Sequence, residues 1–408
     1  MIQRLARAEV EAALSDTPVV LIHGPRQCGK STLAREFADG STRRYITFDN
    51  PFSLEQASAN PLKFLREFDG PLVIDEVQRV PKLFLPLKMV VDEDRTPGRY
   101  LLTGSANVLS LPKIADSLAG RMAIVDLLPF SQSEIEGRGA NFVEEVFAGR
   151  IPTKVPELRD EDLSRRITVG GFPESNARKS ASSRERWFED YLRAIVERDV
   201  RDLANIDALA QIPRVLRLLA ARSGSTLNVS SLSRDTGIPH TSMHRYLDLL
   251  EAIFLIHPTP AWSNNRGARV TKTPKSFLVD TGLLCLLDNV NPSLLERDRE
   301  RLGSVIQSFV AMELKKLARY AEGRPIVHYL RTVTQLEVDL VLEAKGGGVV
   351  GIETSAAKSV GSEDVRGLQF LQELAGEQFH VGLVLYCGNK VEQVAGRIWA
   401  VPISALWA

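Results

Sequence analysis

The chain has 408 residues, 44% apolar and 25% charged, which is enough for about two to four globular domains. Its 51 Lys and Arg residues balance 51 Asp and Glu residues, which argues against a protein devoted to non-specific nucleic-acid binding. Three scattered cysteines exclude a disulfide framework and favour a reducing compartment. No apolar run approaches the roughly 18 residues that cross a bilayer, and the charged amino-terminal stretch is no signal peptide, so we expect a cytoplasmic protein without a membrane contact.

The stretch TPVVLIHGPRQCGKSTLAREFA predicts a buried strand from Val19 to Ile22, a loop, and a helix from about Lys30. The loop fits the pattern G-x-x-x-x-G-K-[ST], in which glycines let backbone N–H groups surround a phosphate at a helix N-terminus. Lys30 is expected to reach the β- and γ-phosphates of ATP, and Ser31 to hold Mg²⁺. A reactive thiol at Cys28 is one reading, and a tolerated small residue is the other. The predicted nucleotide contacts in this loop are Gly24, Pro25, Arg26, Gln27, Cys28, Gly29, Lys30, Ser31 and Thr32.

A second apolar strand, in GPLVIDEVQRV, ends at Asp75 and Glu76. Ligands of open parallel sheets bind beyond the carboxyl ends of the strands, where both acids would emerge. We therefore expect Asp75 to hold Mg²⁺ and Glu76 to orient and polarise the attacking water.

Two later segments offer further groups to this site. A third strand, GRYLLTGSAN, ends in Thr103, Ser105 and Asn107, of which Ser105 or Asn107 is predicted to sense the γ-phosphate, unless this is an ordinary polar turn. Arg121 precedes another strand and could stabilise the transition state in cis or from a neighbouring subunit, or could be a solvated surface arginine.

The segments GPRQCGKS, VIDEVQ, LLTGSAN, SLAGRM, GGFPE, KTPKSFLVDTGLL and EVDLVLE resemble bacterial and archaeal AAA-type P-loop ATPases that carry a winged-helix segment and a nuclease-like C-terminal domain. The resemblance implies an α/β fold class: a P-loop NTPase parallel sheet, then a helical and winged-helix domain, then an α/β restriction-endonuclease-like domain. It also implies ATP binding, and it marks Lys275 and Asp280 as motif positions without a chemical role. Most of the family is uncharacterised, so no cellular role follows. The expected domains are 1–150 (ATPase), 151–205 (helical linker or lid), 206–290 (winged helix-turn-helix) and 291–408 (nuclease-like, with degenerate chemistry).

The middle of the chain predicts a helix-turn-helix, with Gly237 and Pro239 in the turn. Met243, Leu247 and Leu250 should pack inward, while His240, Thr241, Ser242, His244 and Arg245 should face outward. A basic wing follows. The candidate DNA contacts are Arg245, Arg266, Arg269 and Lys272, and the alternative is a structural or protein-docking surface.

The C-terminal part predicts a long helix carrying Glu313, a strand with Asp339, and a second strand with Glu353. This order is similar to the restriction-endonuclease-like core, in which two carboxylates bind Mg²⁺ and a lysine two residues after the second activates water. This chain has Ser355 at that position, and Lys358 could substitute only if the backbone turns there. Nuclease activity is therefore not expected, and Asp339 and Glu353 form a tentative metal site.

The function that the sequence favours is a Mg²⁺-dependent ATPase that works as a nucleotide-driven switch or remodelling machine, with Lys30, Glu76 and Arg121 as catalytic residues. Its partner would be a protein contacting the winged helix or the C-terminal domain. The alternatives are an ATP-controlled DNA-processing protein and a nucleotide-gated interaction module with little turnover. The oligomeric state and the choice between ATP and GTP stay open.

Overall fold

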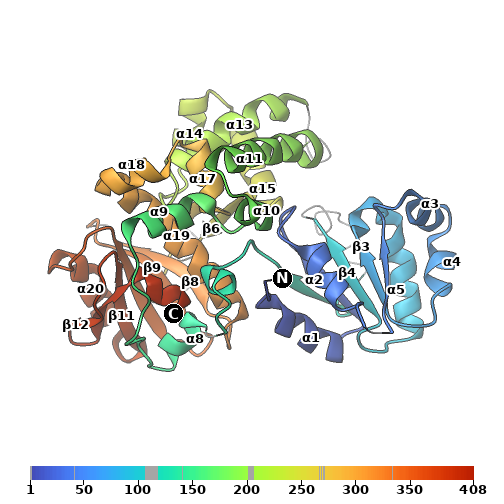
Figure 1. Ribbon diagram of the computed structural model, residues 1–408, viewed down its shortest axis with the longest axis horizontal. Helices are drawn as coiled ribbons and strands as arrows, with labels where there is room; N and C mark the ends of the chain where they lie inside the picture. The colour runs from blue at the N-terminus through green and yellow to red at the C-terminus, as the bar shows by residue number, and fades with distance from the viewer. Residues whose placement is uncertain are drawn as a thin grey trace. The chain divides into compact units, whose positions relative to one another are not determined.

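The computed structural model describes residues 2–40, 42–105, 118–139, 141–200, 206–265, 267, 269, 272–332 and 334–408 (Figure 1). They form two compact units: Gln3–Phe130 with Leu249–Leu255, and Ser131–Asp248 with Ile256–Ala408. Within these described ranges no helix is both long and apolar enough to span a membrane. The four predicted domain boundaries stay predictions.

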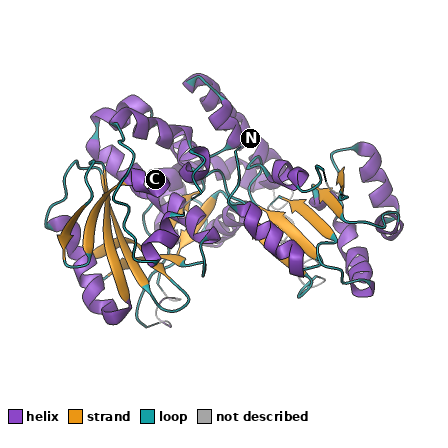
Figure 2. Ribbon diagram, turned by 60° about the horizontal axis from the view of Figure 1, so that its bottom comes forward, coloured by secondary structure: helices purple, strands orange, loops and turns teal. Residues whose placement is uncertain are grey.

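The first unit is built on five strands that all pair in parallel, in the order β2-β3-β4-β1-β5. Figure 2 shows the strands in orange and the helices that accompany them in purple. The strands are β1 (Val19–His23), β2 (Arg44–Thr47), β3 (Leu72–Asp75), β4 (Tyr100–Gly104) and β5 (Met122–Asp126). The helices are α1 (Ala6–Asp16), α2 (Lys30–Glu36), α3 (Pro51–Ala59), α4 (Pro61–Arg66) and α5 (Phe84–Glu93), with 3₁₀ turns η1 (Val77–Arg79) and η2 (Pro81–Leu83).

The parallel sheet explains the apolar runs of the first unit. Every residue of β1, β3 and β4 is buried, as is typical of strands covered on both faces. The strand and helix predicted around the glycine-rich loop are confirmed as β1 and α2. Because β1, β3 and β4 run in the same direction, the loops that follow them leave the same edge of the sheet.

The second unit begins with helices and a hairpin. The helices are α7 (Gln132–Ile135), α8 (Phe142–Phe147), α9 (Asp160–Val169), α10 (Pro173–Ala177), α11 (Ala181–Ile195), the π-helical turn η4 (Val196–Val200), α13 (Ile206–Ala221), α14 (Val229–Thr236) and α15 (His240–Ala252). The last residues of α15, 249–252, are grouped with the first unit. Strands β6 (Ile256–Thr259) and β7 (Lys275–Leu278) pair antiparallel, and α17 (Thr281–Leu287), α18 (Pro292–Arg297) and α19 (Arg299–Tyr320) follow.

The expected helix-turn-helix order is present in α13, α14 and α15. Gly237 ends α14 with φ 71°, a left-handed conformation that favours glycine. Met243, Leu247 and Leu250 are buried, whereas His240 and Arg245 are exposed, so the predicted inner and outer faces of α15 are confirmed. The identification of this segment as a winged helix stays a prediction.

Two sequence motifs meet in the second unit at Asp280. Its carboxylate caps α17 by accepting from the Leu283 N–H at 3.1 Å, and it also accepts from the Gly171 N–H at 2.6 Å. A Cβ at Gly170, which has φ 68°, would lie 2.2 Å from Asp280 Oδ1. The segment GGFPE and the residue Asp280 therefore form one structural junction, which explains a motif position that sequence left without a role.

The C-terminal sheet is mixed, in the order β12-β13-β11-β10-β9-β8. Its strands are β8 (Ile326–Arg331), β9 (Glu337–Glu343), β10 (Val349–Ser355), β11 (Phe379–Tyr386), β12 (Glu392–Ala395) and β13 (Ile398–Pro402). Helix α20 (Arg366–Ala375) and the 3₁₀ turns η5 (Glu363–Val365), η6 (Gly376–Gln378) and η7 (Ile403–Trp407) complete the unit. The predicted long helix and the two strands joined by a tight turn are present as α19, β9 and β10, but β8, which the sequence did not predict, lies between α19 and β9 along the chain.

Candidate nucleotide-binding site and a second carboxylate cluster

The loop between β1 and α2 has the backbone that a phosphate cradle needs. Gly24, Gln27 and Gly29 have φ values of 158°, 59° and 100°, so the chain turns repeatedly through conformations with positive φ. A Cβ at Gly24 would lie 2.1 Å from the Leu127 carbonyl oxygen, so only glycine fits there. The loop therefore gathers its N–H groups ahead of α2, where a helix N-terminus favours an anion.

Lys30 is 5% exposed and lies folded over this loop. Its Nζ donates to the carbonyl oxygens of Gly24 at 3.0 Å and Pro25 at 2.7 Å. Both acceptors are neutral, and a phosphate oxygen would be a stronger acceptor for the ammonium group. The lysine is thus held at the loop by contacts that a phosphate can replace.

Cys28 serves the structure of the loop. It is fully buried, and its Sγ donates to the Leu127 carbonyl at 3.1 Å. The guanidinium of Arg4, which the sequence did not single out, donates to the carbonyls of Cys28 at 2.8 Å and Leu128 at 2.6 Å. These contacts favour a packing role for Cys28 over an accessible reactive thiol.

The other predicted loop residues keep their side chains closer to solvent. Arg26 and Ser31 are half-buried, and Gln27 and Thr32 are exposed. Ser31 follows Lys30 at the start of α2, so its hydroxyl lies at the helix N-terminus where the sequence predicts a Mg²⁺ ligand.

Asp75, at the end of β3, is 3% exposed and held from two strands. Thr103 Oγ1 on β4 donates to Asp75 Oδ1 at 2.5 Å, and the Tyr45 hydroxyl on β2 donates to Asp75 Oδ2 at 2.8 Å. Burial, with the nearby Asp75 carboxylate adding to it, raises the pKa of Tyr45 to about 12, so the phenol keeps its proton. From the described residues, each carboxylate oxygen accepts one side-chain hydrogen bond and retains acceptor capacity for a hydrated cation.

Glu76 follows in a left-handed conformation, with φ 60° and ψ 42°. Its N–H donates to Thr103 Oγ1 at 3.1 Å. Its carboxylate accepts a hydrogen bond from the side-chain amide of Gln78. Gln78 Oε1 in turn accepts from the Ser105 N–H at 3.3 Å, while the Ser105 hydroxyl is buried without a partner among the described residues. The structure thus brings Asp75, Glu76 and Ser105 together, and Asn107 lies outside the described residues.

Arg121 lies where the parallel strands begin, opposite the edge from which the glycine-rich loop leaves β1. Val19 pairs with Met122 and His23 with Asp126, so Arg121 is roughly 13 Å, one strand length, from the phosphate loop. Its Nε donates to Asp92 Oδ1 at 2.5 Å, and this bond holds the pKa of Asp92 down to about 2. The reading of Arg121 as a finger for its own domain is therefore corrected to a surface ion pair, and the reading in trans stays a prediction.

The second carboxylate cluster lies on β9 and β10. Pairing of these strands ends at Ile352 and Leu340, the residues next to Glu353 and Asp339. Asp339 accepts from Gln307 Nε2 at 2.6 Å, and from the Thr354 hydroxyl at 2.6 Å and N–H at 3.0 Å. Burial raises the pKa of Asp339, and burial together with the charge of Asp339 raises the pKa of Glu353 well above its ordinary value.

Lys358 does not approach this cluster. Its amine forms an ion pair with Asp160 on α9, which Arg299 also contacts. Ser355 accepts from the Ala357 N–H at 3.3 Å. Lys358 therefore does not take the place of the lysine that is missing at Ser355.

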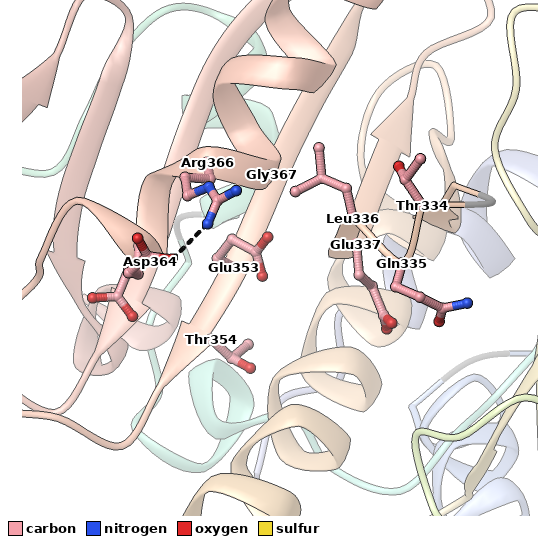
Figure 3. A pocket seen from close by; sticks show the side chains of 10 residues that line it. Thr334, Gln335, Leu336, Glu337, Glu353, Thr354, Asp364, Arg366 and Gly367 are labelled. Atoms are coloured by element: carbon pink, nitrogen blue, oxygen red, sulfur yellow. Dashed lines mark hydrogen bonds and ion pairs between the residues drawn. The ribbon is translucent and has the colours of Figure 1, made fainter.

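A different lysine does approach the cluster. Lys275, on β7, is 2% exposed and forms an ion pair with Glu337, and its charge opposes the raised pKa of both Asp339 and Glu353. Sequence could not find it because the contact joins residues more than 60 positions apart. Figure 3 shows Glu337, Glu353 and Thr354 on the wall of a cavity of about 600 Å³.

A metal site at this cluster stays a prediction. Among the described residues, no group of three or more His, Cys, Asp and Glu side chains is arranged to hold a metal ion. Asp339 is already bonded to Gln307 and Thr354, and Glu337 to Lys275.

The candidate DNA contacts differ in whether their side chains are exposed or engaged within the protein. Arg269 is engaged within its own unit: it pairs with Glu343 and donates to the Ser263 carbonyl at 2.6 Å, so it is not presented to a nucleic acid. Arg245 and Lys272 are exposed, and Arg266 lies outside the described residues. DNA contact by the exposed pair stays a prediction.

Three stretches of the chain match known protein families. Residues 16–136 match the AAA domain family. Residues 160–294 match a domain of unknown function, DUF8612, and residues 302–406 match another, DUF4143. The matches to domains of unknown function assign no activity to the second unit.

Two solved structures are similar in part. The Walker-type ATPase PABY2304 of Pyrococcus abyssi is 16% identical, with 70% of this chain and 96% of that chain covered and a TM-score of 0.46. The RuvB Holliday junction branch migration motor of Thermotoga maritima is 17% identical, with 62% and 89% covered and a TM-score of 0.30. Both TM-scores are below 0.5, so neither likeness carries a functional argument.

Full-length relatives are more similar in sequence. Uncharacterized proteins of Mycobacterium bovis and Mycobacterium tuberculosis are each 30% identical over 344 residues, which is 84% of this chain and 72% of theirs. An uncharacterized protein of Haemophilus influenzae is 28% identical over 291 residues, with 65% and 68% covered. The chain belongs to the family of these uncharacterized bacterial proteins, and its N-terminal part carries an AAA-type P-loop ATPase domain.

Proposed function

We propose that this protein binds ATP with Mg²⁺ at the loop between β1 and α2 and hydrolyses it. The hydrolysis would drive a conformational switch or the remodelling of a partner. The observation that carries the proposal is the position of three side chains: Lys30 begins α2, and Asp75 and Glu76 end and follow β3, all at the carboxyl-end edge of one parallel sheet. The loop at that same edge supports the proposal, because its turns with positive φ and its glycine-specific position at Gly24 suit a phosphate-binding backbone.

The residues would divide the work by their chemistry. Lys30 would exchange its two carbonyl acceptors for phosphate oxygens, and the loop N–H groups would bind the remaining phosphate charge. Ser31 and Asp75 offer the hard oxygen donors that suit Mg²⁺, which when bound neutralises phosphate charge. Glu76 would accept a hydrogen bond from the attacking water and orient it.

The proposal is tested by phosphate release from ATP. Wild-type protein should release phosphate with Mg²⁺ and lose this activity in excess EDTA. Glu76→Gln should bind ATP with little change and release phosphate about 10²–10⁴-fold more slowly, since it lacks the base. The matched control, Glu55→Gln, changes an exposed carboxylate on α3 and should behave as wild type. ATP binding without any turnover would leave only the nucleotide-gated interaction module.

The partner is proposed to be a protein that contacts the second unit. No strong basic excess favours nucleic acid, and Arg269 is bound internally. Affinity capture with Glu76→Gln in ATP, compared with Lys30→Ala, should enrich one protein only in the ATP-bound form. Enrichment of DNA alone would favour the DNA-processing alternative.

A further inference from the structure

Gln78 links two segments of the candidate site. It lies in η1, two residues after Glu76, and is half-buried. Its Nε2 donates to the Glu76 carboxylate, and its Oε1 accepts from the Ser105 N–H beyond the end of β4. Only one orientation of the amide satisfies both contacts, because a flipped amide would set oxygen against carboxylate and NH₂ against N–H.

We infer that Gln78 is a positioning residue that fixes the Glu76 carboxylate relative to the end of β4 and thereby sets its orientation for hydrolysis. This inference rests on the proposed function of Glu76. Thr103 supports the same link, because its hydroxyl bonds to both Asp75 and the Glu76 N–H. Thr103 on β4 thus holds the Asp75 carboxylate and the Glu76 backbone. Gln78 ties the Glu76 carboxylate to Ser105, the residue that follows β4.

The arrangement has a physical reason. Glu76 is in a left-handed backbone conformation, and its other hydrogen bonds to the described residues involve its backbone, so its carboxylate needs a donor to fix it. A neutral amide holds the carboxylate without protonating it or neutralising its charge, as a lysine or arginine would. A glutamine therefore positions a general base while leaving it basic.

The test compares Gln78→Met, which keeps the side-chain length and removes the amide, with Gln56→Met on an exposed position of α3. Gln78→Met should lower kcat about tenfold to a hundredfold, because a hydrogen bond to a charged group is lost in the transition state. ATP affinity, measured by calorimetry, should change less than twofold, and Gln56→Met should match wild type.

A double variant separates positioning from damage to the fold. In a Glu76→Gln background, Gln78→Met should change the residual rate, followed with radiolabelled ATP, by less than twofold, because no carboxylate is left to position. An equal loss in both backgrounds would overturn the inference, as would an unchanged or raised kcat in the single variant.

A crystal structure of nucleotide-free Gln78→Met gives a reading that does not depend on turnover. The Glu76 carboxylate should leave the position that it has in wild type, and an unmoved carboxylate would overturn the link. If wild type hydrolyses no ATP, the proposed function fails, and this structure still decides whether Gln78 holds Glu76. If wild type hydrolyses ATP and Gln78→Met hydrolyses it equally fast, only the inference fails.

Discussion

Lys30 in the first unit and Lys275 in the second are both buried, but they contact different kinds of acceptor. Lys30 donates to two neutral carbonyl oxygens, which an incoming phosphate can replace. Lys275 is paired with the Glu337 carboxylate. A cation on neutral acceptors is ready for an anionic ligand, whereas a cation on a carboxylate is already neutralised. The same residue types therefore favour a binding site in the first unit and an internal clamp in the second.

The acids show the same contrast. Asp75 accepts one hydrogen bond on each oxygen, from Thr103 and from Tyr45, at the edge of the parallel sheet where the glycine-rich loop also leaves β1. Asp339 accepts three from Gln307 and Thr354, and no third carboxylate or imidazole among the described residues completes a metal site. Proximity of acids on strands is therefore a weaker indication of chemistry than the bonding capacity those acids retain.

The largest effect on the second unit should come from Lys275→Met, which leaves Glu337 without its ion pair. We expect a loss of about 1–3 kcal/mol in the free energy of unfolding, less than for a fully buried pair because Glu337 is 32% exposed. Urea denaturation followed by tryptophan fluorescence measures it cleanly, since Trp187, Trp262, Trp399 and Trp407 all lie in the second unit.

Lys272→Met, at an exposed position, is the matched control and should leave the urea midpoint unchanged. If Lys275→Met is as stable as wild type, the Lys275–Glu337 ion pair does not stabilise the second unit. Wild type could instead cleave DNA in the presence of a metal ion, and Lys275→Met or Asp339→Ala could abolish the cleavage. This result would make the cluster a nuclease centre and contradict the view that only the first unit carries a chemical site.

A smaller effect should come from Glu353→Gln. Folding raises the pKa of Glu353 above its unfolded value of about 4.3. Between the unfolded and the folded pKa the folded state binds more protons than the unfolded state, so the stability of wild type falls as pH rises through this range. The variant does not titrate, so it should gain on wild type by about 1 kcal/mol or less at pH 8 and lose the advantage toward pH 4. Urea midpoints in EDTA at both pH values measure this.

The opposite pH trend would mean that Glu353 is stabilised as the anion. The cluster would then resemble an ion-binding site, and added Mg²⁺ should raise the urea midpoint of wild type but not of Glu353→Gln.

The smallest effect is expected for Arg245→Ala with Lys272→Ala. We expect DNA affinity to change less than about twofold, with the same dependence on salt, because the second unit is proposed to contact protein. Fluorescence anisotropy with a labelled duplex across several salt concentrations measures both quantities. A salt slope that falls by about one for each removed cation would place phosphates on this surface instead.

Much of the first unit could be predicted because its signals are local. The glycine-rich loop, the strand before it and the helix after it occupy one continuous stretch, and Asp75 follows an apolar strand. Gln78 and Tyr45 could not be assigned, because their contacts depend on which strands become neighbours: β3 lies between β2 and β4. The choice among the readings of Arg121 stayed open for the same reason, since its position before a strand does not say at which edge of the sheet that strand begins.

The second unit was harder to predict because its defining contacts join distant segments. Asp280 binds Gly171, and Lys275 binds Glu337, across separations that no local pattern records. The missing lysine at Ser355 was visible in the sequence, but the lysine that comes close in space was not. The helix-turn-helix faces, by contrast, follow from helical spacing and were predicted residue by residue.

The most direct test of the account is calorimetric titration of ATP with Mg²⁺ into wild type and Lys30→Ala, with Lys82→Ala as an exposed control. The account predicts saturable binding by wild type and by the control, and an affinity about 10- to 100-fold weaker for Lys30→Ala, because charged hydrogen bonds to phosphate are lost. Equal affinity in Lys30→Ala and wild type would contradict it.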